Sequence, residues 1–315
     1  MKRTYDDYKN KFEEKINESK NNITKFKIIK LINAHDYLVN SVSIFPSGTI
    51  ISVSYDKSIK IYDTNYNIIQ NIQSAHNNGI IYVDIKDEHN FVTCSDDKSI
   101  KTWIKNNNEF LLNKNINNAH NDCIYKVIYY SNQNLISCSF DKTVKIWEEK
   151  DKNYQLIITL KHSNWLYSIL LIEDKNILIS SGFNETKLWN LNNFELIKNF
   201  DKVKCNGWNA LSRIDDDRII IGGNKILSII SLLKKTIIKE ISIFFYCYGI
   251  KSIKEKGLFL VGGEKKDIII FRNINYECIQ IFKNIHNDYI NGFIELKNNL
   301  FGSYSNDGKI IIWTF

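Results

Sequence analysis

The sequence predicts an all-β protein in which one short unit is repeated seven times, and two observations support this prediction. Five of the six histidines stand 27 residues ahead of an aromatic residue. In four of these pairs an aspartate follows the histidine by 21 residues, and a serine or threonine precedes the aromatic residue by ten. The sets are His35, Ser52, Asp56 and Tyr62; His76, Thr93, Asp97 and Trp103; His120, Ser137, Asp141 and Trp147; His162 and Trp189; and His286, Ser303, Asp307 and Trp313.

The spacing of the unit-ending aromatic residues indicates how many units there are. They follow one another at intervals of 41, 44 and 42 residues, and a gap of 124 residues then precedes Trp313. Unit ends at Ile230 and Phe271 divide that gap into intervals of 41, 41 and 42 residues. A period of about 40–45 residues that ends in tryptophan is typical of a four-stranded β-propeller blade. We therefore expect a seven-bladed propeller of antiparallel four-stranded blades, one domain over residues 24–315 with blade-ending positions at 62, 103, 147, 189, 230, 271 and 313.

Within each unit the local pattern is that of short strands. Runs rich in Ile, Val, Tyr and Phe, such as residues 134–139 and 143–147, are separated by polar turns such as Ser139-Phe140-Asp141-Lys142. This alternation predicts short antiparallel strands joined by tight turns. Asn, Asp and Lys supply most of the turn positions, since the chain has a single proline, Pro46.

The two ends of the repeat region predict how the ring closes. The last unit stops at Phe315, just after the aromatic residue of its third strand, and has no fourth strand of its own. An extended apolar run, KFKIIKLI at 25–32, precedes the first unit. We expect this run to form the outer strand of the last blade, which leaves only short, protected strand edges.

Residues 1–23 form a separate extension with a different pattern. Tyr5, Tyr8, Phe12 and Ile16 recur at spacings of three and four residues with charged residues between them. This period predicts a short amphipathic helix over residues 4–20. The helix either packs on the propeller or binds a partner, and the sequence does not decide between the two.

Two segments resemble the end-of-repeat pattern of a known family. They are SCSFDKTVKIWE at 137–148 and SYSNDGKIIIW at 303–313, and the chain from about residue 24 onward resembles the WD-repeat β-propeller family. Three units carry Ala-His in place of the usual Gly-His, and only Tyr62 is followed by aspartate. The resemblance implies that the histidine lies in the loop entering a blade and the aspartate in the turn between strands two and three. The hydroxyl residue lies on the second strand and the aromatic residue on the third.

The repeated sets have two interpretations, a metal or acid–base site or hydrogen-bonded groups that stabilise each blade. Identical spacing in separate blades would keep the sets far apart, so we interpret them as structural. The sequence also has no P-loop, dinucleotide fingerprint or nucleophile elbow. We therefore predict no catalytic, cofactor-binding or metal-binding residue, and no enzyme activity.

Units four to six depart from the pattern. In unit four Phe183 stands at the aspartate place and Asn184 one residue later. In units five and six Lys204 and Tyr246 stand at the histidine places, and Gly-Gly pairs at 222–223 and 262–263 allow an unusual turn. Either the set has decayed there, or this part of the rim is adapted to a partner.

Composition favours a soluble intracellular protein, cytoplasmic or nuclear, that does not insert into membranes. No apolar run approaches the roughly 18 residues of a membrane span, and the N-terminus lacks a secretory signal. The six cysteines are scattered without a Cys-x-x-Cys pair, which favours a reducing compartment. The net charge is +7, but lysines are spread along the chain, so nucleic-acid contact is expected only within a larger assembly.

The family resemblance implies partner binding on the face that carries the histidine loops and aspartate turns. The position before the turn aspartate and the aromatic residues after the histidine place are expected to point there; the alternative is that several turn inward. The predicted partner-binding face consists of Tyr37, Tyr55, Asp96, Phe140, Trp165, Trp208, Tyr248, Tyr289 and Asn306. Exposed aromatic side chains of this kind commonly anchor protein interfaces.

The function that these observations favour is a non-catalytic protein–protein interaction scaffold or adaptor, a monomeric propeller within a complex. A ribosome- or RNA-associated propeller is one alternative, favoured by size and basic charge. A substrate receptor of a ubiquitin ligase is another, although the Trp-Asp-x-Arg signature is replaced by Trp103-Ile104, Trp147-Glu148 and Trp189-Asn190. The sequence does not identify the partners or the pathway.

Overall fold

The computed structural model describes residues 26–131 and 133–315, and in them the chain is all-β. The predicted helix at 4–20 and the proposed extension 1–23 lie outside the described residues. No α-helix occurs in the described part, where the only helical turns are the short 3-10 elements η1 (Glu173–Lys175) and η2 (Lys254–Lys256).

Four of the sheets are formed by consecutive groups of four antiparallel strands. The first is β2 (Val39–Ile44), β3 (Ile50–Ser54), β4 (Ile59–Tyr62) and β5 (Ile68–Ile72). The second is β6 (Ile80–Ile85), β7 (Asn90–Ser95), β8 (Ile100–Asn106) and β9 (Glu109–Ile116). The third is β10 (Ile124–Tyr130), β11 (Asn134–Ser139), β12 (Thr143–Lys150) and β13 (Asn153–Lys161). The fourth is β14 (Leu166–Ile172), β15 (Ile177–Gly182), β16 (Glu185–Asn190) and β17 (Leu196–Asp201).

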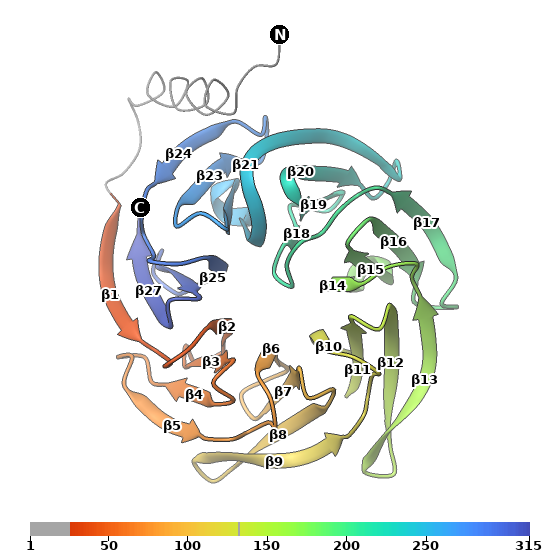
Figure 1. Ribbon diagram of the computed structural model, residues 1–315, viewed down its shortest axis with the longest axis vertical. Coiled ribbons are helices and arrows are strands. Elements are labelled where there is room, and N and C mark those ends of the chain that lie inside the picture. Colours follow the sequence, from red (N-terminus) through yellow and green to blue (C-terminus); the bar gives the residue numbers. More distant parts are fainter. Residues whose placement is uncertain (1–25, 132) are drawn as a thin grey trace.

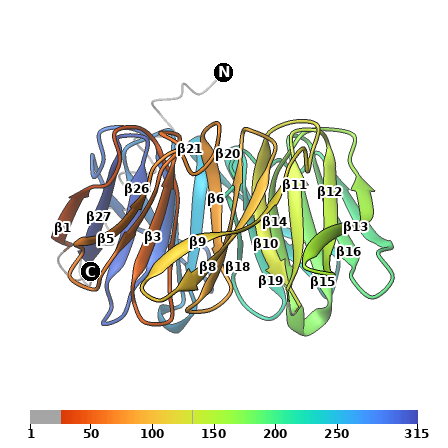
Figure 2. The ribbon, with the colours of Figure 1, turned by 90° about the horizontal axis from the view of Figure 1, so that it is seen from below.

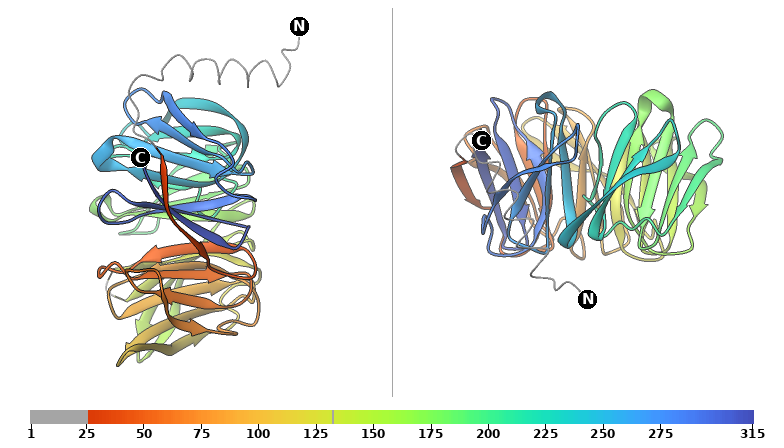
Figure 3. Two further views of the ribbon diagram at one scale, coloured as in Figure 1. Left: turned by 90° about the vertical axis from the view of Figure 1, so that its left-hand side faces the viewer. Right: turned by 90° about the horizontal axis from the view of Figure 1, so that it is seen from above.

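A fifth four-stranded sheet joins the two ends of the chain. It combines β25 (Ile290–Glu295), β26 (Phe301–Ser305) and β27 (Lys309–Thr314) with β1 (Lys27–Asn33). Strand β1 pairs antiparallel with β27, from Lys27 opposite Thr314 to Asn33 opposite Lys309, and Figure 3 shows it running beside the C-terminal strand. The prediction that the apolar run before the first unit completes the last sheet is therefore confirmed, with the strand covering 27–33.

Units five and six differ from the expected separate blades because one strand serves both. The remaining strands form one seven-stranded sheet: β18 (Leu211–Arg213), β19 (Arg218–Gly222), β20 (Asn224–Ser231), β21 (Thr236–Ile253), β22 (Leu258–Gly263), β23 (Ile268–Arg272) and β24 (Cys278–Phe282). The first part of β21 pairs with β20, and its last part, from Cys247, pairs with β22. Gly263 lets β21 approach closely, because a side chain there would collide with the carbonyl oxygen of Tyr246.

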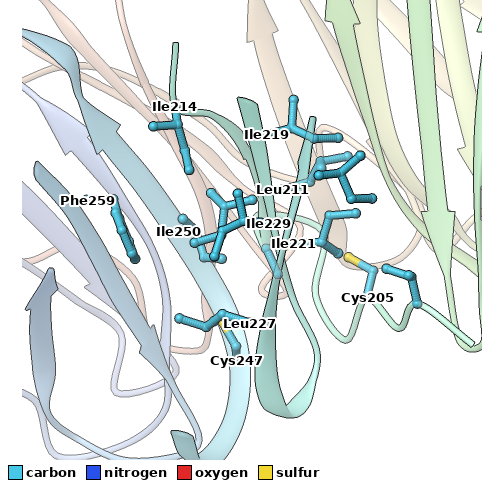
Figure 4. Close-up of a cluster of buried hydrophobic side chains, with 14 of the residues drawn as sticks. Cys205, Leu211, Ile214, Ile219, Ile221, Leu227, Ile229, Cys247, Ile250 and Phe259 are labelled. Carbon is cyan, nitrogen blue, oxygen red and sulfur yellow. The ribbon is translucent and has the colours of Figure 1, made fainter. Parts of the chain in front are cut away.

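The sheets are arranged around a common centre (Figure 1), with their strands running through the thickness of the molecule (Figure 2). The innermost strands are β2, β6, β10, β14, β18, the end of β21, and β25. Each contacts the next one in this order, and β25 contacts β2. Apolar side chains fill the space between neighbouring units, as Figure 4 shows for Leu227 of unit five and Ile250 and Phe259 of unit six.

A β-bulge beside the unit-ending residue recurs in every unit. In six units the third strand shifts register against the outer strand immediately before that residue, for example between Ile61 and Tyr62. In the last unit the bulge lies on β1 opposite Trp313. The same bulge occurs before Ile230 and Phe271, the two unit ends that carry no aromatic–histidine pair. Bulges increase the local twist of an outer strand.

Candidate functional site

The histidine sets form hydrogen-bonded chains inside single sheets. In unit two Trp103 Nε1 donates to Thr93 Oγ1 at 2.9 Å, and Thr93 Oγ1 lies 2.8 Å from His76 Nε2. His76 Nδ1 lies 3.1 Å from Asp97 Oδ2 on the other side of the ring. Since a carboxylate only accepts, Nδ1 carries the proton and Nε2 accepts from the threonine hydroxyl. This series of hydrogen bonds connects the loop before the inner strand to the turn between strands two and three.

The same geometry occurs in units one, three and seven. The distances from the hydroxyl oxygen to histidine Nε2 are 2.7 Å in the set of His35, and 2.8 Å in the sets of His120 and His286. Those from Nδ1 to the carboxylate are 2.9, 2.9 and 3.1 Å. In unit one Tyr62 replaces tryptophan, and its hydroxyl lies 3.4 Å from Ser52 Oγ.

Electrostatics agree with a structural role for these groups. Burial raises the pKa of the Asp97 and Asp141 carboxyls, but hydrogen bonds from the histidine and from Ser99 or Thr143 outweigh it, and both pKa values lie well below their usual range. Burial also lowers the pKa of His76 and His120, against the opposing effect of the aspartates. Both rings are therefore neutral at pH 7, and both are buried and hydrogen-bonded on two sides, as a structural role requires.

Two further kinds of member were not predicted from the sequence; units one to three have both, unit four has only the lysine, and unit seven has neither. A Ser or Thr two residues after the aspartate, Ser58, Ser99 or Thr143, donates to that aspartate at 2.6 Å. A lysine 25 residues after the histidine donates its Nζ proton to the carbonyl just before the histidine. These lysines are Lys60, Lys101, Lys145 and Lys187. Their fixed spacing was present in the sequence and could have identified them.

Unit four keeps a modified set, which corrects the expectation for Phe183 and Asn184. The acid is Glu185, whose Oε2 lies 2.9 Å from His162 Nδ1, though not aligned for a hydrogen bond. Ser180 lies 2.7 Å from His162 Nε2 and accepts the Trp189 N–H at 2.7 Å. The turn between the second and third strands is one residue shorter in unit four than in unit one. Glu185 therefore stands at the position that Ser58 occupies in unit one, and its longer side chain reaches the histidine from there. Burial and Lys187, opposed by Glu185, lower the pKa of His162 to about 4.

In units five and six the residues at the histidine places make other contacts. Lys204 Nζ lies 5.8 Å from the ring centre of Phe183. Tyr246 is exposed, and its carbonyl accepts the Glu264 N–H at 2.9 Å.

The structure gathers the predicted partner-binding residues into three groups. Phe140 stacks on Trp165, with ring centres 4.4 Å apart, and Trp165 contacts Phe183 at 5.9 Å. Tyr37 contacts Tyr55 at 5.9 Å. The third group is Tyr248 with Tyr289, at 5.8 Å.

The first group extends into a continuous row of aromatic rings across units three to five. Tyr125 lies 5.7 Å from Phe140 and 5.8 Å from Trp208, and Tyr167 contacts both Phe140 and Tyr125. We call this row the aromatic strip: Tyr125, Phe140, Trp165, Tyr167, Phe183 and Trp208. Tyr125, Tyr167 and Phe183 were not predicted, because the first two lie on inner strands, where aromatic residues are expected in the core.

The predicted face residues differ in exposure and in their polar partners. Tyr37, Trp165 and Tyr289 are exposed, and Trp165 keeps 39% of its surface accessible. Trp208 is half-buried and donates its Nε1 proton to the Asn40 carbonyl at 2.8 Å, across the centre of the molecule. Asp96 accepts from Tyr55 and Asn78, and the Asn306 side-chain oxygen accepts from Asn291. Trp208, Asp96 and Asn306 therefore already have intramolecular partners.

Comparison with known proteins identifies the repeat in the first part of the chain. Residues 26–63, 68–103 and 113–148 match the family model "WD domain, G-beta repeat", so residues 26–148 contain WD repeats. A search of curated proteins finds no match to the chain. Among residues 26–131 and 133–315 no group of three or more His, Cys, Asp or Glu side chains could hold a metal ion. In the same residues no helix is long and apolar enough to cross a membrane.

Proposed function

We propose that residues 24–315 form one seven-bladed WD-repeat propeller, closed where β1 completes the last blade, that acts as a non-catalytic scaffold for protein partners. Three observations support the architecture: the family match over 26–148, the succession of inner strands in which β25 contacts β2, and the bulge that recurs seven times. An intracellular location remains a prediction, supported by six cysteines that are all free thiols.

The aromatic strip is the partner-binding surface that we propose. Its exposed part supports this most directly: Trp165 and Phe183 have 39% and 40% of their surface accessible, and neither belongs to a hydrogen-bonded set. Rigid aromatic side chains lose little conformational freedom on binding and commonly dominate the binding energy of interfaces. Because Phe140 and Trp165 stack on each other, the surface is already ordered before a partner binds.

The experiment is affinity capture from cell extract with the wild type and the double variant Trp165→Ala/Phe183→Ala. The matched control is Leu233→Ala/Ile274→Ala, which removes two side chains that are 82% and 83% exposed and lie outside the strip. We expect the strip variant to lose proteins that the wild type and the control both retain. Trp208 is left unchanged because its substitution would break the bond to Asn40. Unchanged capture by the strip variant would rule out this surface.

The capture also distinguishes an RNA-associated function. Binding to nucleic acid releases counterions and weakens steeply as salt rises. Capture that persists in the strip variant but disappears with moderate salt or after nuclease treatment would favour the RNA-associated alternative.

A further inference from the structure

A polar cavity of about 380 Å³ lies between the inner strands, and its lining includes Asn209, the residue after Trp208 of the aromatic strip. On the strip side Trp208 bonds to Asn40, and the Asn209 amide donates to the Asn40 and Asn291 carbonyls at 3.4 and 3.1 Å. The lining extends in the other direction to Ile44, Ile85 and Glu295, the last residues of β2, β6 and β25. The cavity therefore extends toward the face opposite the strip.

Two lysine side chains from different sheets line this cavity, together with two carboxylates. Burial lowers the pKa of Lys126 and of Lys251, and the charges of Asp84 and Glu295 oppose this effect without a direct ion pair. Lys126 is only 6% exposed; its Nζ lies 3.4 Å from Ser168 Oγ and 4.9 Å from the ring centre of Tyr82. Lys251 lines the same space from β21. Among the described residues no carboxylate forms an ion pair with either ammonium group. A buried ammonium has three protons to donate, and leaving them unmatched is costly.

The hydroxyl groups around Lys126 indicate where a ligand would lie. The Ser168 hydroxyl donates to the Trp208 carbonyl at 2.8 Å, so its oxygen can only accept from Lys126 and hold that side chain in place. Ser212, also in the lining, accepts the Ser252 N–H at 3.3 Å and keeps its own proton to donate. Lys126, Lys251 and Ser212 thus present donors toward one enclosed space.

The remaining charged groups determine how the cavity responds to pH. Asp84 and Glu295 also line it, and burial raises the pKa of Asp84 to about 6, although the Tyr129 N–H and Lys126 oppose this. An adjoining hollow holds Glu173 and the Arg213–Asp174 ion pair, in which the carboxylate already satisfies the arginine. Burial raises the pKa of Tyr82 and Tyr304, which stay neutral. Below about pH 6 the lining therefore becomes more positive.

We propose that this cavity binds a small oxyanion, free in solution, against Lys126, Lys251 and Ser212. Oxyanions have several acceptor atoms, so one ion can accept from both ammonium groups and the hydroxyl. The volume also admits a small organic dianion. The proposal does not depend on partner binding at the strip, because no residue of the strip lines the cavity.

Isothermal titration calorimetry with sodium sulfate, at constant ionic strength with chloride, tests this site. Sulfate keeps its charge between pH 5.5 and 7.5, so changes in affinity report on the protein. We expect saturable binding to one site, several-fold tighter at pH 5.5, and at least tenfold weaker in Lys126→Met. The control Lys198→Met changes an exposed lysine on β17 and should bind as the wild type does. Asp84→Asn should remove the dependence on pH.

Two further measurements complete the test. Titration with succinate distinguishes an organic oxyanion, if it binds more tightly than sulfate, from an inorganic one. Added sulfate should raise the melting temperature of the wild type, because a ligand that binds only the folded state stabilises it, and should not raise that of Lys126→Met. Absence of saturable binding of both anions to the wild type, or equal affinity in the Lys126 and Lys198 variants, would overturn the proposal.

Discussion

Units one to three and seven fix their loops with hydrogen bonds from side chains, whereas in units four and six a loop carbonyl packs directly against a glycine, and unit four also keeps a modified set. In unit two Ser95 on β7 donates its hydroxyl proton to the Gly79 carbonyl at 2.8 Å. In units four and six the equivalent residues are Gly182 and Gly263, and the loop carbonyls of Trp165 and Tyr246 lie where a Cβ atom would be. Both regions keep the outer-strand bulge and the apolar contacts between sheets.

The comparison of units with and without a histidine set shows which interactions form the fold and which arrange the loops on one face. Units five and six have no histidine set, yet their strands pair in the same order as the others. Strand pairing and inter-sheet packing are therefore sufficient for the architecture, and the sets stabilise the loops on one face. The aromatic strip lies over units three to five, where the set changes from complete to absent. Loops released from the histidine–aspartate pattern are free to carry side chains such as Trp165 and Phe183.

The largest expected effect on stability comes from removing β1. No other strand can take its place beside β27. Deleting residues 1–33 exposes the edge of β27 and removes the Phe26 ring from its contacts with Phe282 and Trp313. We expect insoluble or protease-sensitive protein without a cooperative unfolding transition. Urea denaturation and limited proteolysis measure this, with a deletion of residues 1–25, which retains β1, as the control. Cooperative unfolding of the longer deletion would show that the last sheet is stable with three strands.

Substituting Asp97, the acid of a complete set, should lower the free energy of unfolding more than substituting Glu185, the acid of the modified set. Asp97→Ala leaves the His76 ring and the N–H groups of Asn77 and Ser99 without their acceptor. Loss of one partner of a buried pair destabilises by about 3–5 kcal/mol. Glu185→Ala should cost about 1–2 kcal/mol, because its contact with His162 lacks hydrogen-bond alignment. Urea denaturation of both variants provides the comparison, and equal costs would mean that the two sets are equivalent.

The pH dependence of stability should reveal the modified set separately. The pKa of His162 falls from its ordinary 6.5 to about 4 in the folded protein, so the folded state binds this proton more weakly than the unfolded chain. Stability is therefore complete above pH 6.5 and declines as the pH falls toward 4. A shift of 2.5 pKa units corresponds to about 3 kcal/mol. Urea denaturation of wild type and His162→Gln between pH 4 and 7.5 measures the decline, which should be smaller in the variant. An identical decline would assign it to His76 and His120.

The strand content was predictable from the sequence, because spacing survives when individual residues change. The period of about 41 residues between unit ends located Ile230 and Phe271, and each carries the same bulge as the other units. Ser180 and Glu185 escaped prediction because the turn of unit four is one residue shorter and the segment before Ser180 one residue longer. The bond between Trp208 and Asn40 joins residues 168 positions apart, a contact that no local pattern encodes. Only the packed structure reveals that contact.

The smallest expected effect on stability is that of Trp165→Ala, and it decides whether the strip is surface or core. Trp165 is 39% exposed and its main contact is the stacked ring of Phe140. Loss of one aromatic pair costs about 0.5–1.5 kcal/mol. Trp103 is 4% exposed within the core between the first two sheets, and Trp103→Ala should cost about 3–5 kcal/mol.

Urea denaturation of these two variants compares a tryptophan that serves the fold with one that the fold does not need. A cost for Trp165→Ala close to that for Trp103→Ala would place Trp165 in the core, and would explain any loss of partner capture as partial unfolding. A cost of about 1 kcal/mol, with capture lost, means that the side chain is retained for binding, since an exposed indole that contributes so little to stability has no structural reason to be there.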